Sequence, residues 1–259
     1  MRALVLALAI AAAAPCASFA QTADQDQCVT DDAATYAADC AAAAKLQKAL
    51  KGNDRRTVAR MIDYPLSRDL PLKPIKTADE FLRHWDEYFD AVTTRALIDQ
   101  KPEQYGWRGI AMVNGMVWFK DGRITAINSD ATAYKKALED TKRAQANTLY
   151  PSVRDYDRIE QQCNTKTLHV RVQKHGDDLR YFAWKRGTPL SAKPVLELRN
   201  GTFEDVGSDG HAVLTFKNDD FTYQLDNGAG ICGEDCKSYL TLLKGDKTVS
   251  HQVCSPASK

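Results

Sequence analysis

The sequence predicts a mixed α+β chain, in which helices and a small antiparallel sheet are followed by a second, all-β segment. Three observations indicate this fold class. Helix-capping and helix-stop residues recur before residue 100, two tight-turn dipeptides follow each other between residues 110 and 127, and short strands with regular turns fill the chain after residue 150. A chain of 259 residues is long enough for one large domain or two small ones.

Residues 1–20 have the features of an export signal. Arg2 precedes a short, alanine-rich apolar stretch, and Ser18-Phe19-Ala20 form a small-x-small cleavage site. We expect a mature chain that starts near Gln21 and is periplasmic or secreted. No membrane insertion is expected, because no later window approaches the roughly 18 apolar residues that a spanning helix needs. Cys16 raises the alternative of a lipoprotein, which Pro15 before it disfavours.

The charge balance bears on the class of partner. The chain has 35 basic and 34 acidic side chains, so its formal net charge is +1. Nucleic acids and anionic membranes attract proteins with a basic excess or a basic patch. We therefore expect neither as a partner, and predict another envelope or secreted protein instead.

The cysteines support an oxidising compartment. Of the seven cysteines, Cys16 lies in the signal and an even set remains: Cys28, Cys40, Cys163, Cys232, Cys236 and Cys254. An even set in an exported chain indicates disulfides, although sequence alone cannot choose among the pairings. Proximity along the chain favours Cys28 with Cys40, Cys232 with Cys236, and Cys163 with Cys254.

A zinc site is the competing interpretation of the C-terminal cysteines. Cys232, Cys236, His251 and Cys254 could supply four tetrahedral ligands. Zinc sites usually show tighter C-x-x-C or H-x-x-x-H pairs, and the residues between Cys232 and Cys236 are typical of a small closed loop. We expect neither a metal nor a cofactor.

The first helices are predicted from apolar stripes and stop residues. One helix is expected over about Asp31–Lys51, ended by Gly52, and a second should begin with Asn53 as its N-cap. Its buried face comprises Val58, Met61 and Ile62, and Tyr64-Pro65 ends it. The prolines at positions 65, 71 and 74 then predict an extended segment.

A third helix is predicted from a capping box. Thr77 is followed three residues later by Glu80, so each side chain can satisfy a main-chain N–H at the helix start. Aromatic and aliphatic residues at spacings of three and four then predict one wide buried face, formed by Phe81, Trp85, Tyr88, Phe89 and Val92.

A three-stranded antiparallel meander follows Pro102. Its turns are Asn114-Gly115 and Asp121-Gly122, two dipeptides that favour tight hairpins. The runs that flank them are apolar on both faces, which indicates a sheet that is buried on both sides or lines a cavity.

This arrangement resembles the nuclear transport factor 2-like, or SnoaL-like, α+β cone over roughly residues 30–130. The resemblance rests on Tyr64-Pro65-Leu66, on the Phe81, Trp85 and Phe89 stripe, and on the two runs Trp107–Phe119 and Ile124–Asn128. It implies a curved sheet wrapped around helices with one apolar pocket. It implies little about function, because that fold serves enzymes, binding modules and structural domains alike.

The remaining chain predicts a helical linker over residues 132–151 and an antiparallel β domain over 152–259, following a cone-like domain over 21–131. Leu168, Val170 and Val172 alternate with Thr167, His169 and Arg171, which is the period of a half-buried strand. Seven or eight short strands with regular turns favour a small sandwich or barrel.

No catalytic motif is present. The sequence lacks a G-x-S-x-G elbow, an H-E-x-x-H pair, a phosphate-binding glycine loop and a dinucleotide fingerprint. His84 is the single histidine before residue 169, and it is the one weak candidate for a general base, with Asp86 or Asp99 to orient it. Trp85, Arg108 and Trp118 are candidates for lining a pocket.

These observations favour a non-enzymatic exported protein-binding module. An inhibitor of an envelope hydrolase or an immunity protein against a secreted toxin has this combination of export signal, disulfides and missing catalytic motif. Two alternatives stay open: an enzyme that uses the apolar pocket of the cone, and an accessory or scaffolding protein of the envelope.

Overall fold

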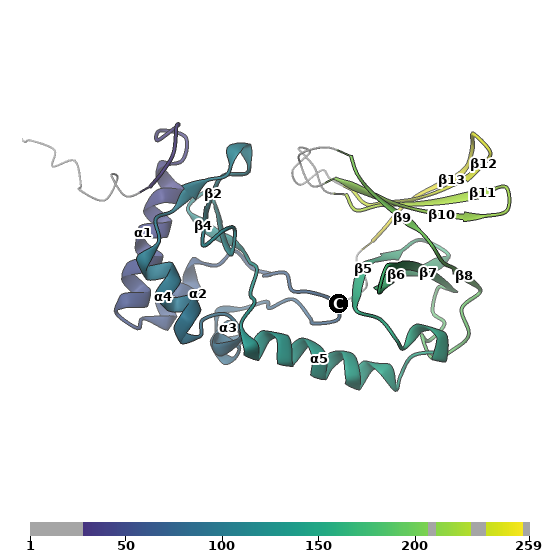
Figure 1. Ribbon diagram of the computed structural model, residues 1–259, viewed down its shortest axis with the longest axis horizontal. Coiled ribbons are helices and arrows are strands. Elements are labelled where there is room, and N and C mark those ends of the chain that lie inside the picture. The colour runs from purple at the N-terminus through teal and green to yellow at the C-terminus, as the bar shows by residue number, and fades with distance from the viewer. Residues whose placement is uncertain (1–27, 207–210, 229–236, 256–259) are drawn as a thin grey trace, which may run out of the picture.

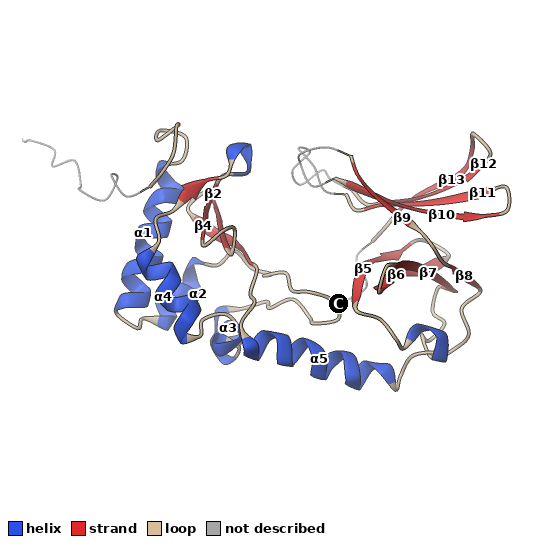
Figure 2. Cartoon of the chain, viewed as in Figure 1, coloured by secondary structure: helices blue, strands red, loops and turns tan. Residues whose placement is uncertain are grey.

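The computed structural model describes residues 28–206, 211–228 and 237–255 (Figure 1). These residues form helices and three antiparallel sheets, so the predicted mixed α+β class is confirmed (Figure 2). The expected export signal at residues 1–20 lies outside the described residues. Among the helices of the described ranges, none is long and apolar enough to span a membrane.

Two helices open the first part of the chain, residues 28–131. Helix α1 covers Ala37–Lys51 and α2 covers Arg55–Met61. The first begins later than predicted, because Asp32 organises a turn by accepting a hydrogen bond from the Thr35 N–H at 3.0 Å. The N-cap of α2 is Asp54 and not Asn53, which adopts a left-handed φ of 51° in the connection.

The prediction of a single helix after Thr77 is wrong. The segment divides into α3 (Ala78–Arg83), the short 3-10 helix η2 (Trp85–Glu87) and α4 (Ala91–Asp99). Thr77 caps α3 as predicted, but Asp90 caps a new helix by accepting from the Thr93 N–H at 2.7 Å. The periodicity therefore does not continue through Asp90, and Val92 is 79% exposed although it was predicted to be buried.

The predicted meander is present, with one short additional strand. Its strands are β1 (Glu103–Gln104), β2 (Ile110–Met112), β3 (Val117–Lys120) and β4 (Arg123–Ile127), hydrogen-bonded in that order. At the second turn, Asp121 and Gly122 have φ values of 53° and 73°, as a tight hairpin requires. The Gly122 N–H donates to Asp39 Oδ1 at 2.7 Å, which fixes this turn against α1.

Side chains fill the space between these helices and this sheet. Leu46 of α1, Phe81 of α3 and Tyr88 are fully buried, and Phe119 of β3 is 1% exposed. All four belong to one hydrophobic cluster. The cluster therefore lies between the helices and the sheet.

Two segments connect the first part with the rest of the chain. Helix α5 covers Thr132–Ala146, within the predicted linker; Tyr134 near its start packs into the first cluster, and Leu149 beyond its end packs into another. The loop between α2 and α3 forms a long arm (Figure 1). Leu66 and Ile75 pair at its base, and Leu70 packs against the same cluster as Leu149.

The second part of the chain, residues 152–255, contains two antiparallel sheets after the 3-10 turn η4 (Pro151–Val153). One sheet has the order β5-β6-β7-β8, the other β13-β12-β11-β10-β9. Their strands are β5 (Arg158–Asn164), β6 (Leu168–His175), β7 (Asp178–Lys185), β8 (Leu196–Leu198), β9 (Thr202–Asp205), β10 (Ala212–Asn218), β11 (Phe221–Asp226), β12 (Tyr239–Lys244) and β13 (Lys247–Val253).

The two sheets share one hydrophobic cluster. Val170, Val172 and Tyr181 enter it from the first sheet, and Phe216 and Leu225 enter it from the second. Sequence analysis missed β5 and β9. Strand β5 is mostly polar, and every residue of β9 is exposed, so neither shows the alternation of a half-buried strand.

Strand β6 corrects a further prediction, because it is buried on both faces. Arg171, predicted to lie on a solvent face, is completely buried and lies against Tyr156, which belongs to the same cluster as Leu149. Its guanidinium lies 4.4 Å from the Tyr156 ring centroid and donates to Gln173 Oε1 at 2.7 Å and Gln145 Oε1 at 3.1 Å. Burial lowers the pKa of Arg171.

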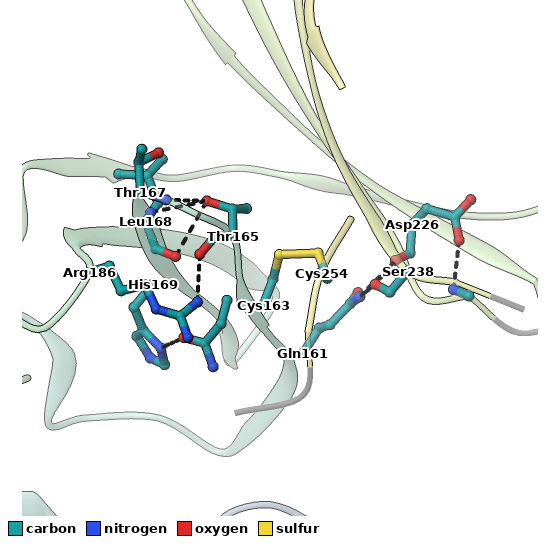
Figure 3. The surroundings of a disulfide bond; sticks show 12 residues. Gln161, Cys163, Thr165, Thr167, Leu168, His169, Arg186, Asp226, Ser238 and Cys254 are labelled. Carbon is teal, nitrogen blue, oxygen red and sulfur yellow. Dashed lines mark hydrogen bonds between the residues drawn. A yellow bond between two sulfur atoms is a disulfide. The ribbon is translucent and has the colours of Figure 1, made fainter. Parts of the chain in front are cut away.

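Two disulfides are present among the described residues, and both are pairs that proximity favoured. Cys28 bonds to Cys40, and Cys163 bonds to Cys254 (Figure 3). Cys232 and Cys236 lie outside the described residues, so their expected bond stays a prediction. The alternative zinc set loses one ligand, since the Cys254 sulfur is already bonded.

Candidate functional site

An open groove on the first part is the candidate functional site. It has a volume of about 790 Å³ and lies between the end of α1, the start of α2, η2, α4 and the first turn of α5. Its apolar lining comprises Ala49, Leu50, Trp85, Phe89, Ala91 and Ile98. The volume is within the range of sites that hold a ligand or a few side chains of a partner.

Trp85 and Phe89 form the floor of the groove. Their ring centroids lie 4.6 Å apart, and they are 6% and 3% exposed. The Arg55 guanidinium lies over the Trp85 ring, 5.0 Å from its centroid, and 3.9 Å from Asp86. Both members of this ion pair are solvent-exposed, so the contact is weak and Arg55 can move aside without a large cost.

The walls of the groove are held by side chains that cap helix ends. Buried Gln47 of α1 donates through Nε2 to the carbonyl oxygens of Leu97 and Gln100 at 2.9 and 2.7 Å, which fastens the end of α4 to α1. Asp54 accepts from the Thr57 N–H at 3.0 Å. Hydrogen bonds from the Thr57 side chain and main chain lower the pKa of Asp54, so it stays a charged cap at neutral pH.

The rim carries charges of both signs. Asp54, Asp86 and Asp90 lie on it, as do Arg55, Arg95 and Lys136. Two of the carboxylates cap helices, and Arg95 and Lys136 pair with Asp99 and Asp140 along their own helices. An apolar floor with such a rim can bind an apolar side chain flanked by charged ones.

His84, the weak catalytic candidate, does not line this groove. Its Nδ1 lies 2.7 Å from Glu87 Oε1, and Arg68 pairs with the other carboxylate oxygen of Glu87. The Glu87 main-chain oxygen accepts from Ser129 Oγ at 2.6 Å. This network connects η2 with the arm and with the start of α5, so its role in the structure is to hold elements together. Asp86 faces Arg55 instead, and Asp99 pairs with Arg95.

Of the other predicted pocket residues, only Trp85 lines the groove. Trp118 of β3 is half-buried against Tyr105, with ring centroids 5.5 Å apart. Arg108 ends the exposed 3-10 turn η3 (Gly106–Arg108), with its guanidinium 5.9 Å from the Trp107 ring centroid. The three predicted residues therefore belong to three different surroundings.

Sequence analysis missed most of the groove. Ala91, Thr94, Arg95 and Ile98 recur at spacings of three and four, which places them on one face of α4. That pattern is visible in the sequence, but the boundary at Asp90 is needed to recognise it. Arg55 and Lys136 carried no such pattern, because their places in the lining of the groove depend on how α2 and α5 pack against α4.

Within the ranges that the structure describes, no group of three or more His, Cys, Asp or Glu side chains is arranged to hold a metal ion. No protein-family model, no curated protein and no solved structure matches this chain. The functional assignment consequently depends on the geometry of the groove and on the sequence.

Proposed function

We propose that the chain is an exported, non-enzymatic protein-binding module whose groove over Trp85 holds a segment of another envelope or secreted protein. The observation that carries this proposal is the groove with an apolar floor of Trp85 and Phe89, bordered by charges of both signs. Such a surface combines an anchor pocket with a polar rim, as protein interfaces commonly do.

The occupant we propose is an apolar or aromatic side chain on a partner segment that also carries a carboxylate. Arg55 is the reason for the carboxylate. It covers Trp85, and its ion pair with Asp86 is exposed to solvent. A partner carboxylate can draw the guanidinium off the ring and open the floor for the neighbouring apolar side chain.

The scaffold proposed for this groove is the nuclear transport factor 2-like cone, followed by a small β-sandwich. The helices that cover one face of the β1–β4 sheet support the first, and the cluster shared by two sheets supports the second. In this proposal the interior of the cone is packed, and binding takes place on the outside of its helices.

An oxidising compartment is part of the proposal. The Cys28–Cys40 and Cys163–Cys254 bonds support export, since disulfides persist mainly outside the cytoplasm. The partner class is then an envelope hydrolase that the chain inhibits or a secreted toxin against which it protects. No cofactor is required for either role.

The test is co-purification of the mature protein from its own periplasm, with two variants on one helix. Thr94→Arg places a long side chain into the groove, while Val92→Arg changes an outward side chain that is 79% exposed and does not line it. We expect a stoichiometric partner with the wild type and with Val92→Arg, and its loss with Thr94→Arg. Retention of the partner by a folded Thr94→Arg protein would contradict the proposal.

A further inference from the structure

A second pocket lies in the other part of the chain, where the turn between β5 and β6 meets the end of β13. Its volume is about 440 Å³. Seven of its eight lining residues are polar or charged, and they come from three chain segments: Asn164, Thr165 and Lys166; Arg186; and His251, Gln252, Val253 and Ser255.

The charges around this pocket are all of one kind. Lys166 and Arg186 contribute two cations and His251 an imidazole, and none of the described residues that line the pocket is a carboxylate. Within the described residues, neither Lys166 nor Arg186 forms an ion pair. Unpaired cations that converge on a cavity attract an anion, because a bound anion would satisfy both their charge and their N–H donors.

The first wall of the pocket is fixed by a tight turn. Buried Thr165 accepts through Oγ1 from the N–H groups of Thr167 and Leu168 at 3.3 and 3.0 Å, and this turn presents Lys166. Arg186 donates from Nη1 to the Thr165 carbonyl oxygen at 2.6 Å, and Figure 3 shows its guanidinium beside this turn and His169. The remaining N–H groups of the guanidinium are available for a ligand.

The second wall is positioned by β12 and β13. The His251 ring stacks on Tyr239, with centroids 4.5 Å apart, and its Nδ1 lies 2.8 Å from Thr241 Oγ1. These two contacts fix the orientation of the ring. They leave Nε2 as the nitrogen that can face a ligand.

The two walls are joined both covalently and by the main chain. Cys163 and Cys254, which form a disulfide (Figure 3), directly precede the lining residues Asn164 and Ser255. Asn164 and Ser255 exchange two main-chain hydrogen bonds of 3.1 and 2.8 Å. Gln161 adds a further connection between the sheets, since its Nε2 donates to the Asp226 carbonyl oxygen at 2.7 Å. The cationic side chains are therefore held on a rigid frame.

From this arrangement we propose that the pocket binds a phosphate or sulfate group, with Arg186 and Lys166 as its principal ligands and His251 as a third. Burial is the main cause that lowers the pKa of neighbouring His169, and the positive charges of Arg171 and Arg186 lower it further. The proposal is independent of the groove over Trp85 and of the partner that groove binds.

The experiment is calorimetric titration of the mature protein with sodium phosphate and with sodium sulfate, at constant ionic strength. We expect saturable binding to one site with a Kd of about 1 mM or tighter. The variant Lys166→Gln/Arg186→Gln should weaken it by about tenfold or more, because two charge-assisted contacts are lost. The control Lys135→Gln/Arg143→Gln removes the same charge from exposed positions on α5 and should bind as the wild type does.

A second arm distinguishes the sources of the anion. Flotation with phosphatidylcholine vesicles, with and without phosphatidic acid, tests whether a lipid headgroup phosphate is accepted in addition to the free ion. Binding of either phosphate source that disappears in Lys166→Gln/Arg186→Gln alone supports the site. Absence of saturable binding to every probe, or equal weakening in both double variants, would overturn it.

Discussion

The two parts of the chain bury their sheets in different ways. In the first part, one face of the β1–β4 sheet packs on the helices, and the other carries half-buried Trp118. In the second part, the β5–β8 sheet is covered on both faces, by the β9–β13 sheet and by the segment around Val153 and Tyr156. The β5–β8 sheet also buries three polar or charged side chains, Arg171, Gln173 and Arg180.

This difference also separates the two candidate sites. The tightly packed interior of the first part leaves its outer helices to form an apolar groove. In the second part, a disulfide joins the two sheets at one end, and the cationic side chains of Lys166 and Arg186 lie near this disulfide. A comparison of the parts under mutation therefore tests whether they are separately stable, as the proposed domain division requires.

Loss of the long-range disulfide should have the largest effect. Cys254→Ser opens a bond with a sequence separation of 91 residues, and the chain-entropy model gives about 4 to 5 kcal/mol for such a closure. Cys28→Ser opens a separation of 12 and should cost about 3 kcal/mol. Hydrogen exchange in urea should show faster exchange in β6 for the first variant and in α1 for the second. Equal loss in both parts from either change would indicate a single cooperative unit.

Substitutions of Arg171 test whether the space between the β5–β8 sheet and the segment around Val153 and Tyr156 excludes solvent. Arg171→Ala leaves a cavity and removes the donor to Gln173 Oε1, while Gln145 Oε1 keeps the Tyr156 hydroxyl as a donor, so we expect a loss of about 3 kcal/mol. Arg171→Met keeps most of the volume without a buried charge and should cost less than about 1.5 kcal/mol. Chemical denaturation monitored by intrinsic tryptophan fluorescence measures both. Two equally mild variants would mean that solvent reaches Arg171.

The sequence predicted this fold unevenly, for physical reasons. Thr77, Asp121 and Gly122 act through local main-chain geometry, so α3 and the meander were predictable. Arg171 was assigned to the solvent face because it alternates with Val170 and Val172, whereas its partners Tyr156 and Gln145 come from distant segments. Trp85 was the one predicted pocket residue that lines the groove, since the remaining walls depend on how α1, α4 and α5 pack.

His84 should matter little to stability or to binding. His84→Ala removes a side chain that is 34% exposed, and Glu87 keeps its contact with Arg68. The free energy of unfolding should fall by less than about 1 kcal/mol, and the partner should stay bound. A turnover assay with any substrate that the protein processes provides the opposing result: a selective loss of 10²–10⁴-fold in rate, roughly what general-base catalysis contributes, would identify an enzyme.

The smallest expected effect concerns acid stability. Burial alone would raise the pKa of Asp178, but hydrogen bonds from the Asn200 N–H and Arg180, together with the charges of Arg180 and Arg199, lower it overall. A carboxyl group with a lowered pKa stabilises the fold above its unfolded pKa of about 3.9, and this contribution disappears as pH falls through the folded value. Asp178→Asn should therefore flatten the stability profile below about pH 4. An unchanged profile in thermal melts across this range would show that the contacts are screened by solvent.

The most direct test of the account is the footprint of the partner on the mature protein. Hydrogen–deuterium exchange should be compared with and without the partner that co-purifies. We predict protection in the peptides that form the groove, around Leu50 to Arg55, Trp85 to Ile98 and Thr132 to Lys136, and none across β12 and β13. Protection across β12 and β13 without protection of α4 would contradict the claim that the groove over Trp85 is the binding surface.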